Sequence, residues 1–216
     1  MLRRRIPPDG YITFSDLTMN EFLSAFKETI SAQEMSLLPL RQFEGEIILV
    51  EAPADVREAV SCLKRARVLG FDTETKPSFR KGNNHKVALL QLATHDQAFL
   101  FRVAKTGIPD ALRNLLSDPG IMKAGVAIHD DLKALQKIRA FKPGGFVELQ
   151  EKAKKMGIRD FSLKKLCAIL LGFRISKSQQ LSNWEAEELT PQQMVYAATD
   201  AWASLIINDK FQQVSP

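Results

Sequence analysis

The sequence predicts an α/β protein in which helices flank a mixed β-sheet and the C-terminal half is helical. Short apolar runs rich in β-branched and aromatic residues recur between residues 46 and 149. From residue 152 onward the apolar residues follow a helical period instead. Strands that come first and helices that follow favour a central sheet covered by helices. With 216 residues the chain is long enough for one large domain.

Composition narrows the class of protein. Hydrophobic residues make up 45% of the chain and charged residues 25%, as in ordinary soluble proteins. No apolar run approaches the roughly 18 residues of a membrane helix, and the basic N-terminus lacks the apolar core of a secretory signal. We therefore expect no membrane partner.

The two cysteines, Cys62 and Cys167, form no metal-binding spacing, and their small number predicts a reducing, cytoplasmic setting. A net charge of +5 mildly favours polyanionic partners.

Residues 1–42 are predicted to be an appendage, partly helical or flexible, and residues 43–216 to be the compact domain. The run Arg3 to Arg5 could contact nucleic acid, although a solvated tail is the stronger alternative. Residues 19–35 could form a helix with Phe22, Phe26 and Ile30 on one face.

Each further element follows from a local pattern. Apolar runs predict strands, amphipathic periods predict helices, and clusters of Pro, Gly and Asn predict loops. The expected strands are 46–51, 68–72, 87–93, 98–103, 122–128 and 145–149. A hairpin turn at 94–97 joins two of them, helices are expected at 54–64, at 109–116 and after residue 131, and 76–84 is an exposed loop.

The last two helices carry clear end signals. Ser162 is a plausible N-cap and Gly172 a stop for a helix over 162–171. Thr190 followed by Pro191 starts another helix, which should reach about residue 211.

Two acids close the strand at 68–72. Asp72 and Glu74 are two residues apart, so in a strand their side chains point to the same face. Such a pair suits a divalent cation, because hard cations prefer carboxylate oxygens. For an isolated pair, however, capping a loop or pairing with lysines is the more frequent explanation.

Two more acidic positions follow. Asp130 and Asp131 close a strand and open a helix, and either could simply be an N-cap. Tyr196 and Asp200 are four residues apart on one helical face, and could be an ordinary hydrogen-bonded pair. Each ordinary explanation is favoured alone, but all three together are much less expected by coincidence.

These motifs resemble those of the DEDD-type 3′–5′ exonucleases, in the branch whose third motif contains tyrosine. The resemblance rests on Phe71-Asp72-Thr73-Glu74, on Gly125 to Leu135, and on Tyr196-Ala197-Ala198-Thr199-Asp200. Residues 86–92 and 181–184 resemble the Werner-type exonucleases more than ribonuclease D. The resemblance covers about residues 43–212 and implies a ribonuclease H-like fold.

The resemblance also implies a set of catalytic residues: Asp72, Glu74, Asp131, Tyr196 and Asp200. The four acids would hold two divalent cations, Mg²⁺ or Mn²⁺, and such pairs lie about 3.5–4 Å apart in two-metal sites. Asp72 would bridge them, Glu74 and Asp200 would complete one site, and Asp131 would hold the second cation through water. Tyr196 would aim the attacking water, since a phenol with a pKa near 10 is a poor base at neutral pH.

The motif also favours Asp131 over its neighbour. The family's acid is followed by a leucine and a helix, as Asp131 is followed by Leu132. Asp130 is then expected to cap that helix or to face solvent.

The resemblance therefore predicts a metal-dependent enzyme that removes 5′-mononucleotides from the free 3′ end of a nucleic acid. The alternative is a catalytically silent adaptor that binds nucleic acid through a basic face. Degenerate relatives of that kind usually lose an acid, and none is lost here. The Werner-like motifs favour DNA, whereas ribonuclease D relatives process RNA.

Substrate contacts are weaker predictions. Lys81 and Lys86 could hold phosphates, but solvated lysines are an equally good alternative. Trp184 could stack on a base or ribose, and a buried packing tryptophan is as well supported.

Overall fold

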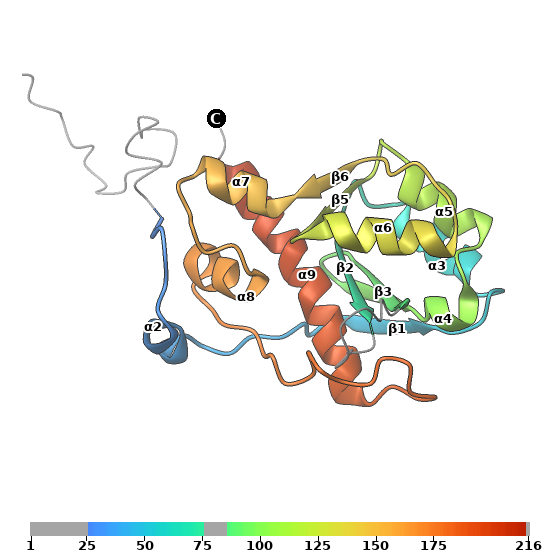
Figure 1. The fold of residues 1–216 in the computed structure, drawn as a ribbon, viewed down its shortest axis with the longest axis horizontal. Helices are drawn as coiled ribbons and strands as arrows, with labels where there is room; N and C mark the ends of the chain where they lie inside the picture. The colour runs from blue at the N-terminus through green and yellow to red at the C-terminus, as the bar shows by residue number, and fades with distance from the viewer. Residues whose placement is uncertain (1–25, 76–85, 215–216) are drawn as a thin grey trace, which may run out of the picture.

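The computed structural model describes residues 26–75 and 86–214, which fold around one six-stranded sheet (Figure 1). The strand order is β1-β4-β3-β2-β5-β6. The antiparallel pairs are β2 with β3 and β3 with β4, and the other three neighbouring pairs are parallel. The predicted mixed sheet is therefore confirmed. The strands are β1 (Glu46–Val50), β2 (Val68–Thr75), β3 (Val87–Ala93), β4 (Gln97–Phe101), β5 (Met122–Gly125) and β6 (Phe146–Glu148).

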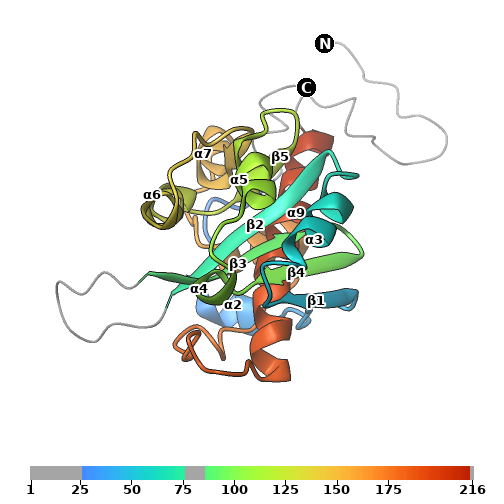
Figure 2. The same cartoon turned by 90° about the vertical axis from the view of Figure 1, so that its right-hand side faces the viewer.

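Helices cover both faces of this sheet (Figures 1 and 2). One face carries α3 (Val56–Leu63), α5 (Asp110–Ser117) and α6 (Ile128–Ile138). The other carries the long α9 (Pro191–Val214) with α7 (Leu149–Lys155), α8 (Leu163–Leu166) and a π-helical segment, Cys167–Leu171. The short helices α2 (Ala32–Leu37) and α4 (Val103–Thr106) complete the set. Within the described ranges, no helix combines the length and apolarity needed to cross a membrane.

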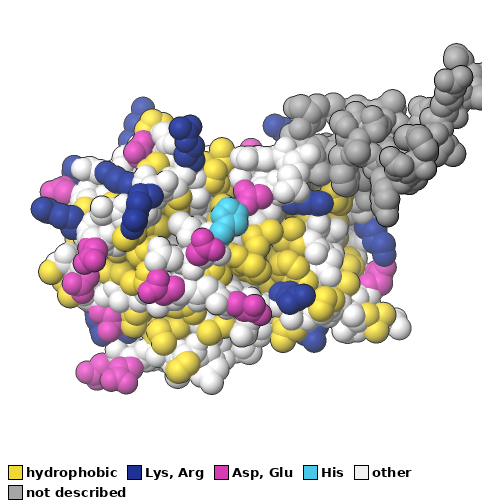
Figure 3. Space-filling view, turned by 180° about the vertical axis from the view of Figure 1, so that it is seen from behind, with side chains coloured by type: hydrophobic (Ala, Val, Ile, Leu, Met, Phe, Trp, Pro, Cys, Tyr) yellow, Lys and Arg dark blue, Asp and Glu magenta, His cyan; other side chains and the backbone are white. Residues whose placement is uncertain are grey.

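Charges of both signs share the face that is turned away from the viewer in Figure 1. Figure 3 shows Lys and Arg side chains interspersed there with Asp and Glu, with hydrophobic side chains between them. The described residues of this face therefore present no extended surface of one charge.

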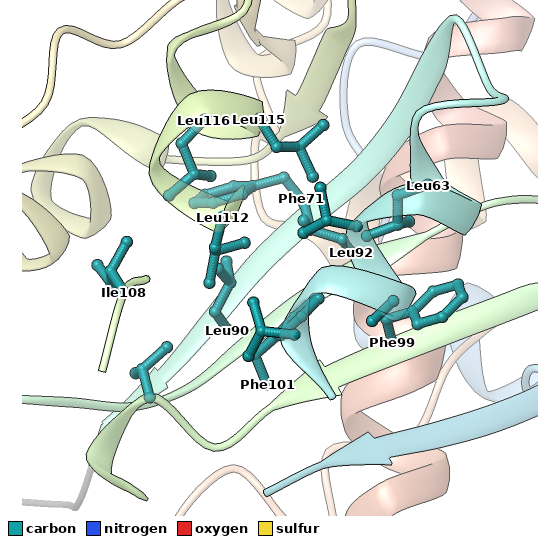
Figure 4. Packing of buried hydrophobic residues seen from close by; sticks show 14 of the residues in the cluster. Leu63, Phe71, Leu90, Leu92, Phe99, Phe101, Ile108, Leu112, Leu115 and Leu116 are labelled. Carbon is teal, nitrogen blue, oxygen red and sulfur yellow. The ribbon is translucent and has the colours of Figure 1, made fainter. Parts of the chain in front are cut away.

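The core on the α3–α5–α6 side is built from alternate strand residues (Figure 4). Leu69 and Phe71 of β2 point into it, and Leu112 and Leu116 of α5 pack against them. β3, in contrast, is buried along its whole length because helices cover it on both faces. This explains why its sequence is apolar on both faces, with Gln91 as its one polar residue.

The opposite face of β2 meets α9 backbone to backbone. A Cβ built on Gly70 would lie 1.8 Å from the carbonyl oxygen of Ala201 and 3.1 Å from Cβ of Leu205. Only glycine allows this close approach. The approach brings residue 200 of α9 next to the residues that follow Gly70 on the same face of β2.

Several predicted boundaries need correction. β2 does not end at Asp72 but continues to Thr75, because its backbone stays paired with β3. β5 ends at Gly125, before the predicted residue 128, since the chain turns there into α6. The predicted helix over 19–35 is wrong for residues 26–31: Ser31 caps a helix that begins only at Ala32. The arginine run at 3–5, the predicted loop at 76–84 and Lys81 lie outside the described residues.

Residues 30–43 lie along the body of the domain. The amide of Ile30 donates to Asp160 (2.9 Å), Leu40 forms a parallel bridge with Arg174, and the amide of Phe43 donates to Thr199 Oγ1 of α9 (3.0 Å). Thus, part of the predicted appendage contributes packing, and the division at residue 43 stays a prediction.

The Gly70 contact predicts a large effect of one methyl group. We expect Gly70→Ala to lower the free energy of unfolding by about 3 kcal/mol, because neither the β2 backbone nor the Ala201 carbonyl can move away freely. Urea unfolding checks this. Gly120→Ala is the matched control, since the added Cβ would meet only the Asp118 side chain, at 3.2 Å. Equal stability of the two variants would contradict this account of the packing.

Candidate active site

Three carboxylates meet where α9 crosses β2. Ligand oxygens of Asp72, Glu74 and Asp200 all lie within 4.8 Å of one another. Asp72 and Glu74 share the face of β2 that also carries Gly70, and they point toward α9. The strand and the helix thus bring together acids that are far apart in the sequence.

Asp131 reaches this site from the other side of β2. Thr73, whose side chain points away from Asp72 and Glu74, donates its hydroxyl hydrogen to Asp131 Oδ1 at 2.5 Å. The structure therefore separates the four predicted acids into a tight group of three and a fourth beside them. Asp130 faces solvent, its side chain 93% exposed and paired with Lys133 at 3.4 Å.

A tight turn before α6 sets the position of Asp131. Ala127 at this turn has φ 59°, the only positive φ of a non-glycine residue in the described part of the chain. The carboxylate of Glu148 accepts hydrogen bonds from the amides of Ala127 (3.0 Å) and Ile128 (2.9 Å). Glu148 thus accepts hydrogen bonds from two backbone amides at the start of α6, which has no side-chain cap from its own N-cap residue.

Tyr196 lies one helical turn before Asp200 and donates its hydroxyl hydrogen to the Asp200 carboxylate. Its ring packs against Trp184, with the ring centroids 5.9 Å apart and the planes inclined by 37°. Trp184 is fully buried. Between the two interpretations of Trp184, this geometry favours the packing residue over the stacking platform.

The acids are difficult to ionise together. Burial, followed by the charges of Asp200, Glu74 and Asp131, raises the pKa of Asp72 well above its usual value. Burial and the same kind of repulsion raise the pKa of Glu74 to about 9. The pKa of Asp200 is raised to about 7 by burial, although the Tyr196 hydrogen bond and Lys177 act in the opposite direction. Burial raises the pKa of Asp131 to about 6.

Lysines stand at the edge of this acidic group. A cavity of about 260 Å³ opens onto Asp72, Glu74, Tyr196 and Asp200. The opposite wall comes from the segments around α8 and residues 175–180, and its polar side chains are Ser162, Lys164, Ser176, Lys177 and Gln180. No periodicity or motif in the sequence marks these residues as part of a site, and Ser162 is predictable only as an N-cap. Lys86, in contrast, lies at the start of β3 and is exposed.

The residues fit a divalent cation. The donors are carboxylate oxygens, the ligands that Mg²⁺ and Mn²⁺ prefer. The charge of Lys177 acts on Asp200, and a single lysine compensates only one of the negative charges. A bound cation would supply the positive charge that this group of buried and half-buried carboxylates lacks.

Comparisons with known sequences agree with this geometry. The sequence profile described as "3′–5′ exonuclease" matches residues 47–215. The mouse (Mus musculus) bifunctional 3′–5′ exonuclease/ATP-dependent helicase WRN is 35% identical over 80% of this chain, which spans 13% of that protein. A 3′–5′ exonuclease of Arabidopsis thaliana is 30% identical over 77% of this chain, which spans 63% of that protein. The chain thus covers less than two thirds of either relative.

Solved structures share the fold. The Nibbler EXO domain of Aedes aegypti superposes with a TM-score of 0.72 at 26% identity, covering 82% of this chain and 91% of that domain. RNase D of Escherichia coli gives a TM-score of 0.71 at 22% identity, covering 78% of this chain and 45% of that one. The predicted ribonuclease H-like fold is confirmed.

The crowded acids predict an unusual effect on stability. In metal-free protein, Asp72→Asn should raise the free energy of unfolding by on the order of 1 kcal/mol, because folding no longer has to bring an ionisable carboxyl into the crowded acidic group. Mg²⁺ or Mn²⁺ should raise the melting temperature of the wild type and not that of the variant. Thermal melts with EDTA or with each cation measure both effects. Asp130→Asn is the matched control and should behave as the wild type does. A variant that the cations stabilise as they do the wild type would contradict the site.

The raised pKa values also predict how stability depends on pH. Glu74 has an ordinary pKa of 4.5 and a folded pKa of about 9, so between these values the folded state binds more protons than the unfolded chain. The free energy of unfolding of metal-free protein should therefore fall as pH rises through this window. Urea unfolding in EDTA at several pH values checks this, and Asp72→Asn should flatten the dependence. Stability that rises steadily over the same window would rule out the interpretation.

Proposed function

The chain belongs to the 3′–5′ exonuclease family, and we propose that it removes nucleotides one at a time from the 3′ end of a nucleic acid. Water attacks the terminal phosphodiester phosphorus, the bond to the 3′ oxygen of the preceding nucleotide breaks, and that oxygen takes a proton. A 5′-mononucleotide leaves. The observation that carries the proposal is the group of Asp72, Glu74 and Asp200 beside Tyr196.

In this proposal the acids hold two divalent cations, Mg²⁺ or Mn²⁺. Asp72, Glu74 and Asp200 would hold one cation, and Asp131 would help to hold the other. Such cations lower the pKa of water and stabilise the negative charge that develops on the leaving oxygen. The hydrogen bond from Thr73 keeps Asp131 turned toward β2, which supports its part in the second site.

Tyr196 orients the attacking water. Burial and the neighbouring carboxylates raise the pKa of its hydroxyl well above the ordinary value, so the phenol keeps its proton and cannot act as a base. A protonated hydroxyl that already faces Asp200 can accept a hydrogen bond from water and hold its oxygen toward the phosphate. Its contribution is therefore to geometry rather than to proton transfer.

Lys177 and Lys164 are the candidates for binding the scissile phosphate. Both line the cavity that contains the acids, and the charge of Lys177 acts on Asp200. A phosphodiester entering beside four carboxylates needs nearby cations of the protein as well as metal ions. Lys86 stays a weaker proposal, because it lies outside this cavity.

The substrate is DNA or RNA with a free 3′ end. The Werner-like motifs at residues 86–92 and 181–184 favour DNA, while the RNase D structures support the fold alone. Both cysteines are free, which supports a reducing, cytoplasmic setting.

The silent adaptor is the second candidate. It is less well supported, because all four acids and the tyrosine are in place, and a binding module would gain nothing from burying them. The mixed charges in Figure 3 also give it no basic surface on that face.

Degradation of matched DNA and RNA strands tests the proposal. With a 5′ label, the wild type and Mg²⁺ or Mn²⁺ should give a ladder of shortening products, and with a 3′ label the mononucleotide should appear first. EDTA and Asp72→Asn should each abolish shortening, while Asp130→Asn should retain it. Tight binding without shortening on every strand would favour the adaptor, and full activity in EDTA would exclude the proposed chemistry.

A further inference from the structure

The loop between the cavity wall and α9 is held by buried side chains from outside it. This loop, residues 183–188, contains Trp184 and precedes Thr190, the cap of α9. The side-chain amide of Gln193 donates to the carbonyl of Asn183 at 3.3 Å. That bond fixes the start of the loop to the first turn of the helix.

Arg102 fixes the rest of the loop. It follows β4, and its side chain is only 2% exposed. One guanidinium nitrogen donates to the carbonyl of Glu187 (3.0 Å) and to the carboxylate of Glu51 (3.0 Å), and the other donates to the carbonyl of Ala186. A buried guanidinium is costly without hydrogen-bond partners, and these bonds satisfy its two terminal nitrogens, while Nε has no partner among the described residues. Lys105 adds a bond to Glu187 at 3.0 Å from the more exposed side.

Trp184 connects this anchored loop to the reaction site. Its indole is completely buried in the cluster that also contains Leu189, Ala197 and Ala201, and it lies against the ring of Tyr196. The indole of Trp184 therefore limits the position of the Tyr196 ring, and the indole can move only if the 183–188 loop moves. The phenol oxygen at the far end of this ring points to Asp200.

We propose that Arg102 is a positioning residue for Tyr196, acting through the 183–188 loop and the indole of Trp184. The inference rests on the proposed function, because it assigns Arg102 to the orientation of the attacking water. Arg102 contacts none of the four acids of the candidate active site and does not line their cavity. Its influence on the reaction passes through the position of one aromatic ring.

The variant Arg102→Met tests the inference on the full chain with Mn²⁺ and a labelled oligonucleotide. It should lower kcat about 10-fold, because a ring displaced by a fraction of an ångström holds water poorly, while KM changes less than about twofold. Arg102→Lys keeps the charge but cannot span both carbonyls, so it should be intermediate. Trp184→Phe should retain most of the activity that Trp184→Ala loses.

Lys123 provides the matched control. It is also a fully buried cation that donates to two backbone carbonyls, those of Leu115 (3.1 Å) and Asp118 (2.7 Å). These carbonyls lie at the end of α5, on the other face of the sheet from Tyr196. Lys123→Met should therefore weaken stability without changing kcat per folded molecule, with the folded fraction taken from urea unfolding.

A double-mutant cycle decides whether Arg102 acts through Tyr196. In a Tyr196→Phe background the effect of Arg102→Met on kcat should shrink to less than about twofold, because coupled residues are not additive. An additive effect in the cycle, or an equal fall in kcat for Lys123→Met, would overturn the inference while leaving the exonuclease proposal intact. A wild type without nuclease activity would overturn both.

Fluorescence follows the loop directly. The chain has two tryptophans, so in a Trp202→Phe background Trp184 is the only emitter. A buried indole emits at short wavelength, and Arg102→Met should shift its emission to longer wavelength as the loop loosens. Unchanged emission together with lost activity would contradict the proposed route.

Discussion

The contact between α9 and β2 at Gly70 is the constraint on which the site depends. With no side chain between them, strand and helix backbones come together within a methyl group's reach. Two residues further along β2 is Asp72, and the residue before Ala201 is Asp200, so the packing distance also sets the distance between these carboxylates. A larger residue at position 70 would change both at once. The packing distance between β2 and α9 therefore determines the geometry of the acidic site.

The same contact forces like charges together in a place that water reaches poorly. Hydrogen bonds from Thr73 and Tyr196 stabilise the carboxylates of Asp131 and Asp200, but the repulsion within the group remains. Unfavourable local interactions of this kind are typical of functional sites, where the surrounding structure compensates for them. The helices that bury β3 on both faces stabilise the fold enough to offset this repulsion.

Most of the sheet could be predicted from the sequence, because apolar runs and turn residues report on the local backbone. Asp72, Glu74, Tyr196 and Asp200 could be placed in pairs from strand and helix periods alone. Their grouping across elements required the family resemblance. The position of Asp131 beyond Thr73 could not be predicted, since it depends on which face α6 covers. The role of Arg102 is equally hidden, because its partners in the loop are backbone carbonyls 84 and 85 residues away, and any sequence supplies carbonyls.

The position of α9 in the chain order also matters for synthesis. Asp72 and Asp131 leave the ribosome before the helix that carries Tyr196 and Asp200, and this helix also covers one face of the sheet. A nascent chain that ends before Thr190 has neither a closed core nor the carboxylate of Asp200 beside Asp72 and Glu74. Domains fold as units once their last element is available. The acidic group and the folded core are thus completed by the same segment of the chain.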